Sequence, residues 1–371
     1  MLVVVTVKEV DNNNNVVYIS YIIKPNDNGV YINLNIGVPL QSVSLPISLR
    51  SRISTISSIN YSTNTNNDND VVCDSLILAG NGFYISQYCF NYLPNVTTTT
   101  MEEISFSFKP RNYTNSLIHA LKQNKQIDKL QFALFPKYDN NDTKLPRGII
   151  YCGGVDDDVI KSYEYITTCT VSKVSANWGC FLHYVIFQGS PGKYPIHYYI
   201  RFDYNLKYIY VTKTFLQLLL EYLLNNGAQC SIIKTTANPK EQCIQCQYNV
   251  ILKFKDISFV IDDNIFTIPS VDLFECIANN SLCLSIIRYH IDAHYGWLFG
   301  SMFLHRYGVV YDIDTYTISF HSKTPFSTYT SLPTINNTPS TSLIKHLYII
   351  NISLITLMCI NNIFTSNTKY N

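Results

Sequence analysis

The sequence has few charged residues, and their charges nearly cancel. Only 14% of its 371 residues are Asp, Glu, Lys or Arg, and the formal net charge is +1. A protein that binds nucleic acid needs a basic surface, so this composition argues against that class and we expect no nucleic-acid partner. The charge balance favours neither an acidic nor a basic partner of another kind.

Glycine and proline are also scarce, at 14 residues each, whereas tyrosine reaches 29. Tyr, Ile, Val and Thr favour strands, so the composition indicates a mostly β protein. Turn signals separate short β-branched or alternating runs, which predict strands near residues 16–23, 30–34, 130–135, 148–154, 249–254, 258–261, 265–268, 308–311 and 315–320. Helical spacing of apolar residues predicts two helices, at 115–130 and 214–224.

The N-terminus lacks a recognisable signal peptide, because residues 1–8 have no charged leading region and too short an apolar run. Two other features still favour the secretory pathway or the cell surface. Eleven cysteines predict disulfides, since that number is unusual in a reduced compartment. Seven sequons predict a glycoprotein: Asn60, Asn95, Asn112, Asn141, Asn279, Asn336 and Asn351. Either export uses another route or this start is not the natural one.

The C-terminal end predicts attachment to a membrane. Residues 324–342 are rich in Ser, Thr, Pro and Asn and are typical of a stalk. Residues 347–364 are mostly apolar and reach the lower length limit of a membrane span. A helix docked on the core is the alternative, but it would be unusual after a stalk. We therefore predict a membrane anchor over residues 343–365; a lipid-anchor signal is a weaker option, because the last residues are polar.

Four segments, taken in order, form a recognisable series of motifs. They are YINLNIGVPLQ at residues 31–41, residues 132–135 with 148–156 ending in Gly-Gly-x-Asp, Trp178, and GWLFGSMFLHRYGVVYD at residues 296–312. Each motif alone is weak, but in this order and spacing they resemble the pepsin-like aspartic proteases (peptidase family A1). In that family the first segment is the opening strand and turn, the second is a pair of strands, the tryptophan opens the second lobe, and the last segment forms the final strands.

The resemblance implies an all-β, bilobal fold with a cleft between the lobes. We place the N-terminal lobe at residues 1–165 and the C-terminal lobe at 166–323, with the chain crossing over near 160–170. The implied partner is a peptide or protein in the cleft. We expect a monomer, with no cofactor and no metal.

The family hydrolyses peptides with two Asp residues, one from each lobe, each in an Asp-Thr/Ser-Gly motif. One carboxylate activates a water as general base while the other protonates the scissile carbonyl. Counting from residues 36–41, the first motif falls on Ser48-Leu49-Arg50-Ser51. The second falls on residues 203–206, where Asp203 follows Trp178 by 25 residues. Asp203 is therefore retained at the second position, whereas Ser48 is substituted at the first and cannot act as a carboxylate base.

The supporting motifs divide in the same way. The family braces each active loop with two hydrophobic residues and a glycine. This triplet is present as Leu298-Phe299-Gly300, but its counterpart near residues 103–108 has no glycine. Tyr84 is a candidate remnant of the tyrosine in the flap that closes over substrate in the family.

These departures predict a catalytically inactive homologue in which Asp203 is vestigial. Two alternatives stay open. The chain could be an active endopeptidase in which Asp203 works with an unrecognised second carboxylate, at the roughly 3 Å spacing at which a proton is shared. It could also be a structural or adhesive surface protein, with Arg50 and Tyr204 filling the cleft.

Three other constellations have simpler explanations. His290 and His294 have the spacing of helical zinc ligands, but no third ligand is evident. Cys243 and Cys246 lack a second pair, and the resemblance implies that one of them bonds Cys276 or Cys283. Ser48 as a serine nucleophile would need a positioned histidine, which the sequence does not offer.

Overall fold

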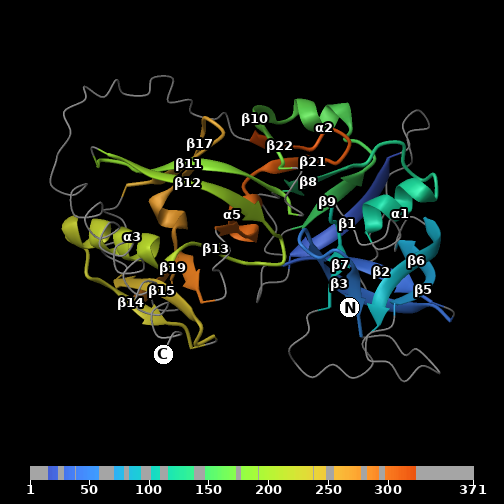
Figure 1. Ribbon diagram of the computed structural model, residues 1–371, viewed down its shortest axis with the longest axis horizontal. Coiled ribbons are helices and arrows are strands. Elements are labelled where there is room, and N and C mark those ends of the chain that lie inside the picture. The colour runs from blue at the N-terminus through green and yellow to red at the C-terminus, as the bar shows by residue number, and fades with distance from the viewer. Residues whose placement is uncertain are drawn as a thin grey trace, which may run out of the picture. The chain divides into compact units, whose positions relative to one another are not determined.

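The computed structural model describes residues 16–23, 29–37, 39–57, 71–78, 83–92, 102–108, 116–137, 147–172, 177–190, 192–236, 238–247, 255–276, 282–291 and 297–322. Its strands form two large sheets (Figure 1). The mostly β fold expected from composition is therefore confirmed.

The first sheet combines strands from the beginning and the end of the described chain. Its order is β10 (Glu164–Thr170), β22 (Thr317–Ser322), β21 (Gly308–Asp312), β8 (Gln131–Lys137), β9 (Arg147–Cys152), β1 (Val17–Ile23), β2 (Val30–Ile36), β5 (Val71–Leu78), β6 (Tyr84–Tyr92) and β4 (Ser54–Ile56). In addition, β3 (Gln41–Ser48) pairs with β2, and β7 (Ile104–Ser105) pairs with β3. Alternate residues of β1 are buried, as expected for a strand with one face on the core.

The second sheet is built from the intervening residues. Its order is β14 (Cys230–Lys234), β15 (Glu241–Gln247), β19 (Leu282–His290), β13 (Ile209–Tyr210), β20 (Leu298–Phe299), β12 (Lys193–Phe202), β11 (Gly179–Phe187), β16 (Ile257–Ile261) and β17 (Asn264–Ile268), with β18 (Phe274–Cys276) also paired to β19. The predicted strands are confirmed except for 249–254, which lies outside the described residues.

The helices are short and pack on the sheets. They are α1 (Leu117–Gln123), α2 (Asp157–Lys161), α3 (Lys213–Asn225), α5 (Ser301–Leu304) and the 3₁₀ helix η2 (Ser270–Asp272). The Thr212 hydroxyl caps α3 by accepting from Phe215 N at 3.2 Å. The first predicted helix is shorter than expected, because Asn124 caps α1 and Lys125 has φ of 57°, which ends the helical path.

Within the described part of the chain there are four disulfides: Cys73–Cys89, Cys169–Cys180, Cys230–Cys246 and Cys276–Cys283. The expectation that Cys243 or Cys246 bonds Cys276 or Cys283 is therefore wrong. The sheet places a cysteine directly opposite Cys246 on each neighbouring strand, Cys230 on β14 and Cys283 on β19, and Cys246 bonds Cys230. Cys243 is a free, buried thiol.

Several expectations concern residues outside the described part. These are the stalk at 324–342, the anchor at 343–365, all seven sequons and His294. Among the described residues, no helix is both long enough and apolar enough to cross a membrane.

Candidate functional site

Ser48 and Asp203 occupy similar places in the two sheets. Ser48 ends β3, which runs parallel to β7 with Ile47 opposite Ile104. Asp203 directly follows β12, which runs parallel to β20 with Phe202 opposite Phe299. Each site residue thus lies at the end of a long strand, beside a short strand that runs parallel to it.

The structure brings these two predicted segments into contact. The backbone N–H of Leu49, next to Ser48, points to Asp203 Oδ1 at 3.5 Å. Nearby, the indole of Trp178 donates to the carbonyl of Phe106 at 3.1 Å, joining the start of β11 to the residues after β7. The site therefore lies where the first and second halves of the chain meet.

Asp203 is fully buried and surrounded by donors. Its Oδ1 accepts from the backbone N–H of Asn205 at 3.1 Å, in addition to the long contact from Leu49. Its Oδ2 forms an ion pair with Nε of Arg50. Donors from Leu49, Arg50 and Asn205 thus converge on one buried carboxylate.

The Arg50 side chain reaches Asp203 from a more open position, because it is 39% exposed while that of Asp203 is 0% exposed. Burial lowers the pKa of Arg50, but the charge and hydrogen bond of Asp203 outweigh this effect and the pKa is raised. Arg50 therefore keeps its proton and its charge throughout the pH range in which proteins are folded.

The hydrogen bonds of Ser48 hold its own loop in place. Its side-chain oxygen accepts from Ser51 N at 3.1 Å, and its carbonyl accepts from Phe106 N at 2.8 Å. Among the described residues, no histidine is hydrogen-bonded to the Ser48 hydroxyl. The arrangement gives no support to a serine nucleophile.

Glu103 is a member of this site that the sequence argument missed. Its Oε1 accepts from the Ser51 hydroxyl, and its Oε2 accepts from the side-chain amide of Asn205 at 3.3 Å. Burial raises the pKa of Glu103; the Ser51 hydrogen bond opposes that rise, and the nearby charge of Asp203 adds to it. The signal in the sequence was an acid at the position that corresponds to Leu298, where the family's brace has a hydrophobic residue.

The two brace segments pack differently at the position of the glycine. The N–H of Gly300 donates to Tyr208 O at 3.0 Å, and a Cβ on Gly300 would lie 2.5 Å from that oxygen and closer still to Leu206 O. Counting from the paired residues of each sheet, Ser105 corresponds to Gly300. The Ser105 hydroxyl instead donates to Ser51 O at 2.5 Å, so the first loop is built around serine side chains.

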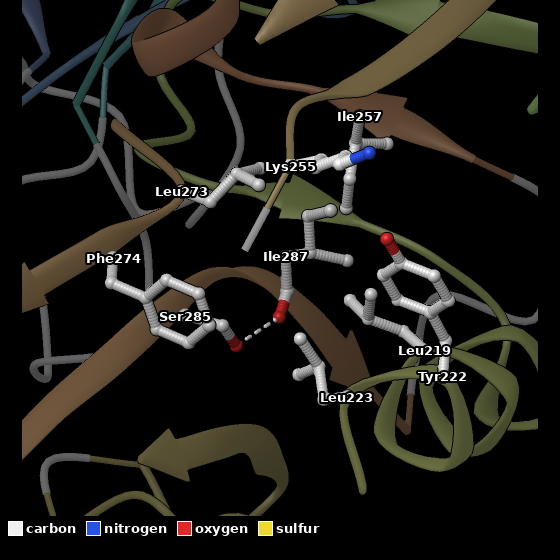
Figure 2. A pocket seen from close by; sticks show the side chains of 9 residues that line it. All are labelled: Leu219, Tyr222, Leu223, Lys255, Ile257, Leu273, Phe274, Ser285 and Ile287. Atoms are coloured by element: carbon white, nitrogen blue, oxygen red, sulfur yellow. Dashed lines mark hydrogen bonds between the residues drawn. The ribbon is translucent and has the colours of Figure 1, made fainter. Parts of the chain in front are cut away.

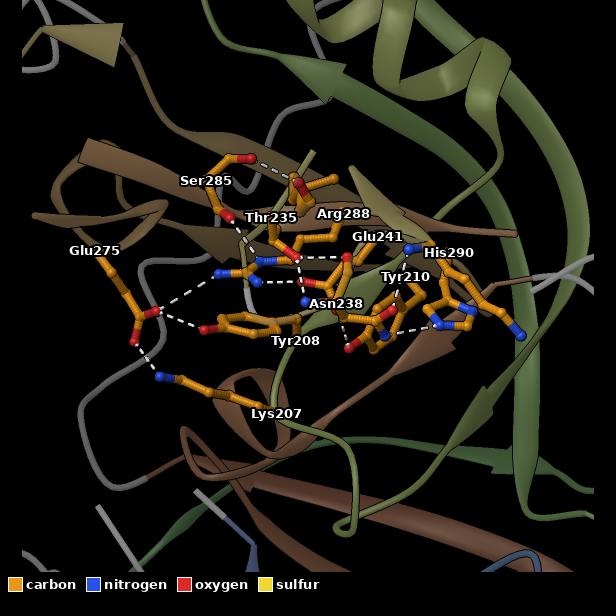
Figure 3. Close-up of polar contacts among 12 residues, drawn as sticks. Lys207, Tyr208, Tyr210, Thr235, Asn238, Glu241, Glu275, Ser285, Arg288 and His290 are labelled. Atoms are coloured by element: carbon orange, nitrogen blue, oxygen red, sulfur yellow. Dashed lines mark hydrogen bonds and ion pairs between the residues drawn. The ribbon is translucent and has the colours of Figure 1, made fainter. Parts of the chain in front are cut away.

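A charged network holds the loop that follows Asp203 (Figure 3). Arg288 pairs with Glu241 and lies 3.9 Å from Glu275, and its guanidinium lies 3.2 Å from the centre of the Tyr208 ring. Lys207 forms an ion pair with Glu275 at 2.7 Å. These contacts tie the loop to β18 and β19, and Arg288 in turn links β19 to Glu241 on β15. The network thereby fixes the backbone that follows Asp203.

Tyr84 and Tyr204 have different surroundings. Tyr84 begins β6 and is 52% exposed, and its role as a flap remnant stays a prediction. Tyr204 is buried against Tyr311 and His305, and burial raises its pKa well above the ordinary value. Tyr204 therefore belongs to the core.

A small apolar pocket lies elsewhere, between α3, η2 and the strands of the second sheet (Figure 2). It is lined by Leu219, Tyr222, Leu223, Lys255, Ile257, Leu273, Phe274, Ser285 and Ile287. This lining offers one ammonium group and no carboxylate, so it contains no pair of acids for peptide hydrolysis.

Comparison with known proteins agrees with this topology. A family model described as eukaryotic aspartyl protease matches residues 55–323, and the chain belongs to this family. The match begins after the segment of Ser48. The pepsin-like fold provides a substrate-binding cleft for peptides. No curated protein matches the chain.

Solved structures show the same fold at low identity. The aspartic proteinase from Irpex lacteus is 14% identical, with a TM-score of 0.61, and the match covers 85% of this chain and 99% of that one. Conglutin gamma, a basic 7S globulin from lupine seeds, is 13% identical with a TM-score of 0.64, over 84% and 95%. The resemblance in sequence and the pepsin-like fold are confirmed.

Proposed function

We propose that this chain is a catalytically inactive aspartic-protease homologue that binds a peptide or protein segment in its cleft. Ser48 stands where the family has its first catalytic Asp, and Asp203 is retained at the second position. The observation that carries the proposal is the ion pair between Arg50 and Asp203.

The ion pair is incompatible with the catalytic mechanism of the family. An aspartic-protease dyad needs two carboxylates that share one proton, so that one acts as acid and the other as base. Arg50 occupies Oδ2 of Asp203, where the family has a second carboxyl group, and it cannot donate its own proton at acid pH. No pair of carboxyl groups is therefore available to activate the attacking water and to protonate the scissile carbonyl.

The cleft function distinguishes this proposal from a purely structural role. Tyr204 is packed into the core, but Arg50 remains 39% exposed, so the polar centre stays accessible from one side. An accessible guanidinium beside backbone and serine groups can contact a bound peptide. We also propose a secretory location, in line with the four disulfides. We propose a membrane anchor over residues 343–365, which membrane fractionation with and without residues 324–371 tests.

One observation favours a second candidate, an active endopeptidase that uses Glu103. Asn205 donates to both carboxylates. Its backbone N–H donates to Asp203, and its side-chain amide donates to Glu103. The raised pKa of Glu103 also suits an acid catalyst. This mechanism requires Arg50 to leave Asp203 when substrate binds.

Proteolysis of an unbiased peptide mixture at about pH 3.5–6 separates the two candidates. The proteins are the wild type, Asp203→Ala and Glu103→Gln, each shown to be folded at the assay pH by circular dichroism. We expect no cleavage above a protein-free blank from any of them. Cleavage by the wild type that disappears in both variants would instead establish the Glu103–Asp203 pair. Retention of particular peptides by the inactive wild type, measured by mass spectrometry, supports cleft binding.

A further inference from the structure

Four cysteines lie in one row across four neighbouring strands of the second sheet. Antiparallel pairing places Cys230 on β14 opposite Cys246 on β15, Cys246 opposite Cys283 on β19, and Cys283 opposite Cys276 on β18. Side chains at directly opposite positions project from the same face of a sheet. The two disulfides of this row, Cys230–Cys246 and Cys276–Cys283, are therefore immediate neighbours.

The same register permits a different bond within the row. The Cα atoms are 4.2 Å apart in Cys230–Cys246 and 4.0 Å apart in Cys276–Cys283. Directly opposite residues of antiparallel strands have Cα separations of about 4.5–5.5 Å, within the range of about 4.4–6.8 Å that a disulfide spans. Cys246 and Cys283 are also directly opposite. They can therefore be joined without moving a strand along its neighbour.

Exposure gives the row a point of entry. Cys276 is exposed at one end of the row, Cys230 is half-buried at the other, and Cys246 and Cys283 between them are buried. A thiolate in solution therefore reaches the sulfur of Cys276 first. The leaving thiolate is then Cys283, which faces Cys246 of the second disulfide.

We propose that this row is a thiol–disulfide exchange site for a small thiol of the glutathione class. The external thiolate bonds Cys276 Sγ, and the Cys276–Cys283 bond breaks to release the Cys283 thiolate. Cys283 then bonds Cys246 Sγ, and the Cys230–Cys246 bond breaks to release the Cys230 thiolate. The two exchange steps start with two disulfides and one thiolate and end with two disulfides and one thiolate, so no oxidant or reductant is consumed.

The exchange changes which strands are covalently linked. Before it, the outer strands β14 and β18 are each tied to an inner strand. After it, only the inner strands β15 and β19 are tied, while Cys276 carries the small thiol and Cys230 is free. The proposal is independent of any activity at Asp203.

The test is to treat the full chain with reduced glutathione, quench with acid, alkylate, digest and identify the products by mass spectrometry. We expect three linked products: a glutathione adduct on Cys276, a Cys246–Cys283 cross-linked peptide and an alkylated Cys230. Cys73–Cys89 is the internal control. It also joins directly opposite residues 4.0 Å apart, with Cys73 exposed and Cys89 buried, but no second described disulfide adjoins it. It should give only an adduct on Cys73 and an alkylated Cys89.

A double variant, Cys276→Ser with Cys283→Ser, removes the entry point and the relay. We expect alkylation of Cys230 to fall at least about tenfold, because the Cys230–Cys246 bond can then open only by direct attack. An unchanged rate at Cys73–Cys89 shows that the variant is folded. The proposal is overturned by an unmodified Cys276, by opening of Cys276–Cys283 with no Cys246–Cys283 peptide, or by equal Cys230 alkylation in both proteins.

Discussion

Arg50 and Asp203 have unequal access to water, and this difference decides what each contributes to stability. Asp203 is fully buried, so its charge depends on the donors around it. Arg50 is partly exposed and can turn its guanidinium toward solvent if its partner is lost. The two halves of the ion pair are therefore not equivalent.

Removing the arginine should cost more stability than removing the aspartate charge. Arg50→Met leaves a buried carboxylate with only its backbone donors, and we expect a loss of about 2–3 kcal/mol in the free energy of unfolding. Asp203→Asn removes that charge and should cost less. Urea unfolding at pH 7 measures both values. In the double variant the asparagine should recover part of the Arg50→Met loss; strictly additive losses would mean that the pair is not coupled.

The sequence singled out two segments but not the contacts between them. Spacing from residues 36–41 pointed to Ser48 and spacing from Trp178 pointed to Asp203, and the structure brings the two segments into contact. The sequence also showed an arginine beside Ser48, but it could not show that this side chain turns toward Asp203. Glu103 was missed because residues 103–108 were searched only for a glycine, and an acid at the position that corresponds to Leu298 was not considered.

At the scale of elements, the brace segment of the second sheet tolerates less change than that of the first. Gly300 lies against two backbone oxygens, of Leu206 and Tyr208, which cannot move without moving the Asp203 loop. Ser105 has room for a side chain and uses it to bond Ser51. The two loops thus reach similar places in the fold by different packing.

Gly300→Ala should therefore be strongly destabilising, by about 3 kcal/mol or more, because the new methyl group overlaps backbone atoms. Gly192→Ala is the matched control, since a Cβ there meets no atom within 4 Å. We expect a change within about 0.5 kcal/mol for the control. Denaturant midpoints at constant slope provide the comparison, and equal effects of the two substitutions would refute the steric account.

The strands were more predictable than the disulfides, for a physical reason. Alternating apolar residues mark a strand locally, as in β1 and in the hairpin of β21 and β22. A disulfide depends on the register of strands that are distant in sequence. Cys246 has a cysteine opposite it on both sides, so local spacing could not decide which one it bonds.

For the whole molecule, buried histidines predict a loss of stability in acid. Burial lowers the pKa of His119 and of His305 to about 4, from the ordinary value of 6.5. Above pH 6.5 these groups are neutral in both states, and their contribution is fully present. As the pH falls toward 4, the unfolded chain binds protons that the folded protein does not, so the contribution is lost. Glu103 acts in the opposite direction, because its pKa is raised and its contribution is lost as the pH rises.

We expect the urea midpoint to fall between pH 6.5 and 4, with His119 alone accounting for up to about 3 kcal/mol. His119→Gln should remove part of the slope, although it lowers stability at pH 7. His197→Gln, at an exposed position, is the control and should leave the slope unchanged. A wild-type midpoint that stays constant or rises on acidification would contradict this prediction.

The pairing of β8 with β21 sets the order in which the protein can be completed during synthesis. Roughly 170 residues separate these strands, so a ribosome adding about 5–20 residues per second makes β21 some 10–35 s after β8. During that interval β8 presents an unpaired strand edge. An open edge of this kind can pair with another chain, so the newly made N-terminal half is prone to aggregation until its last strands emerge from the ribosome.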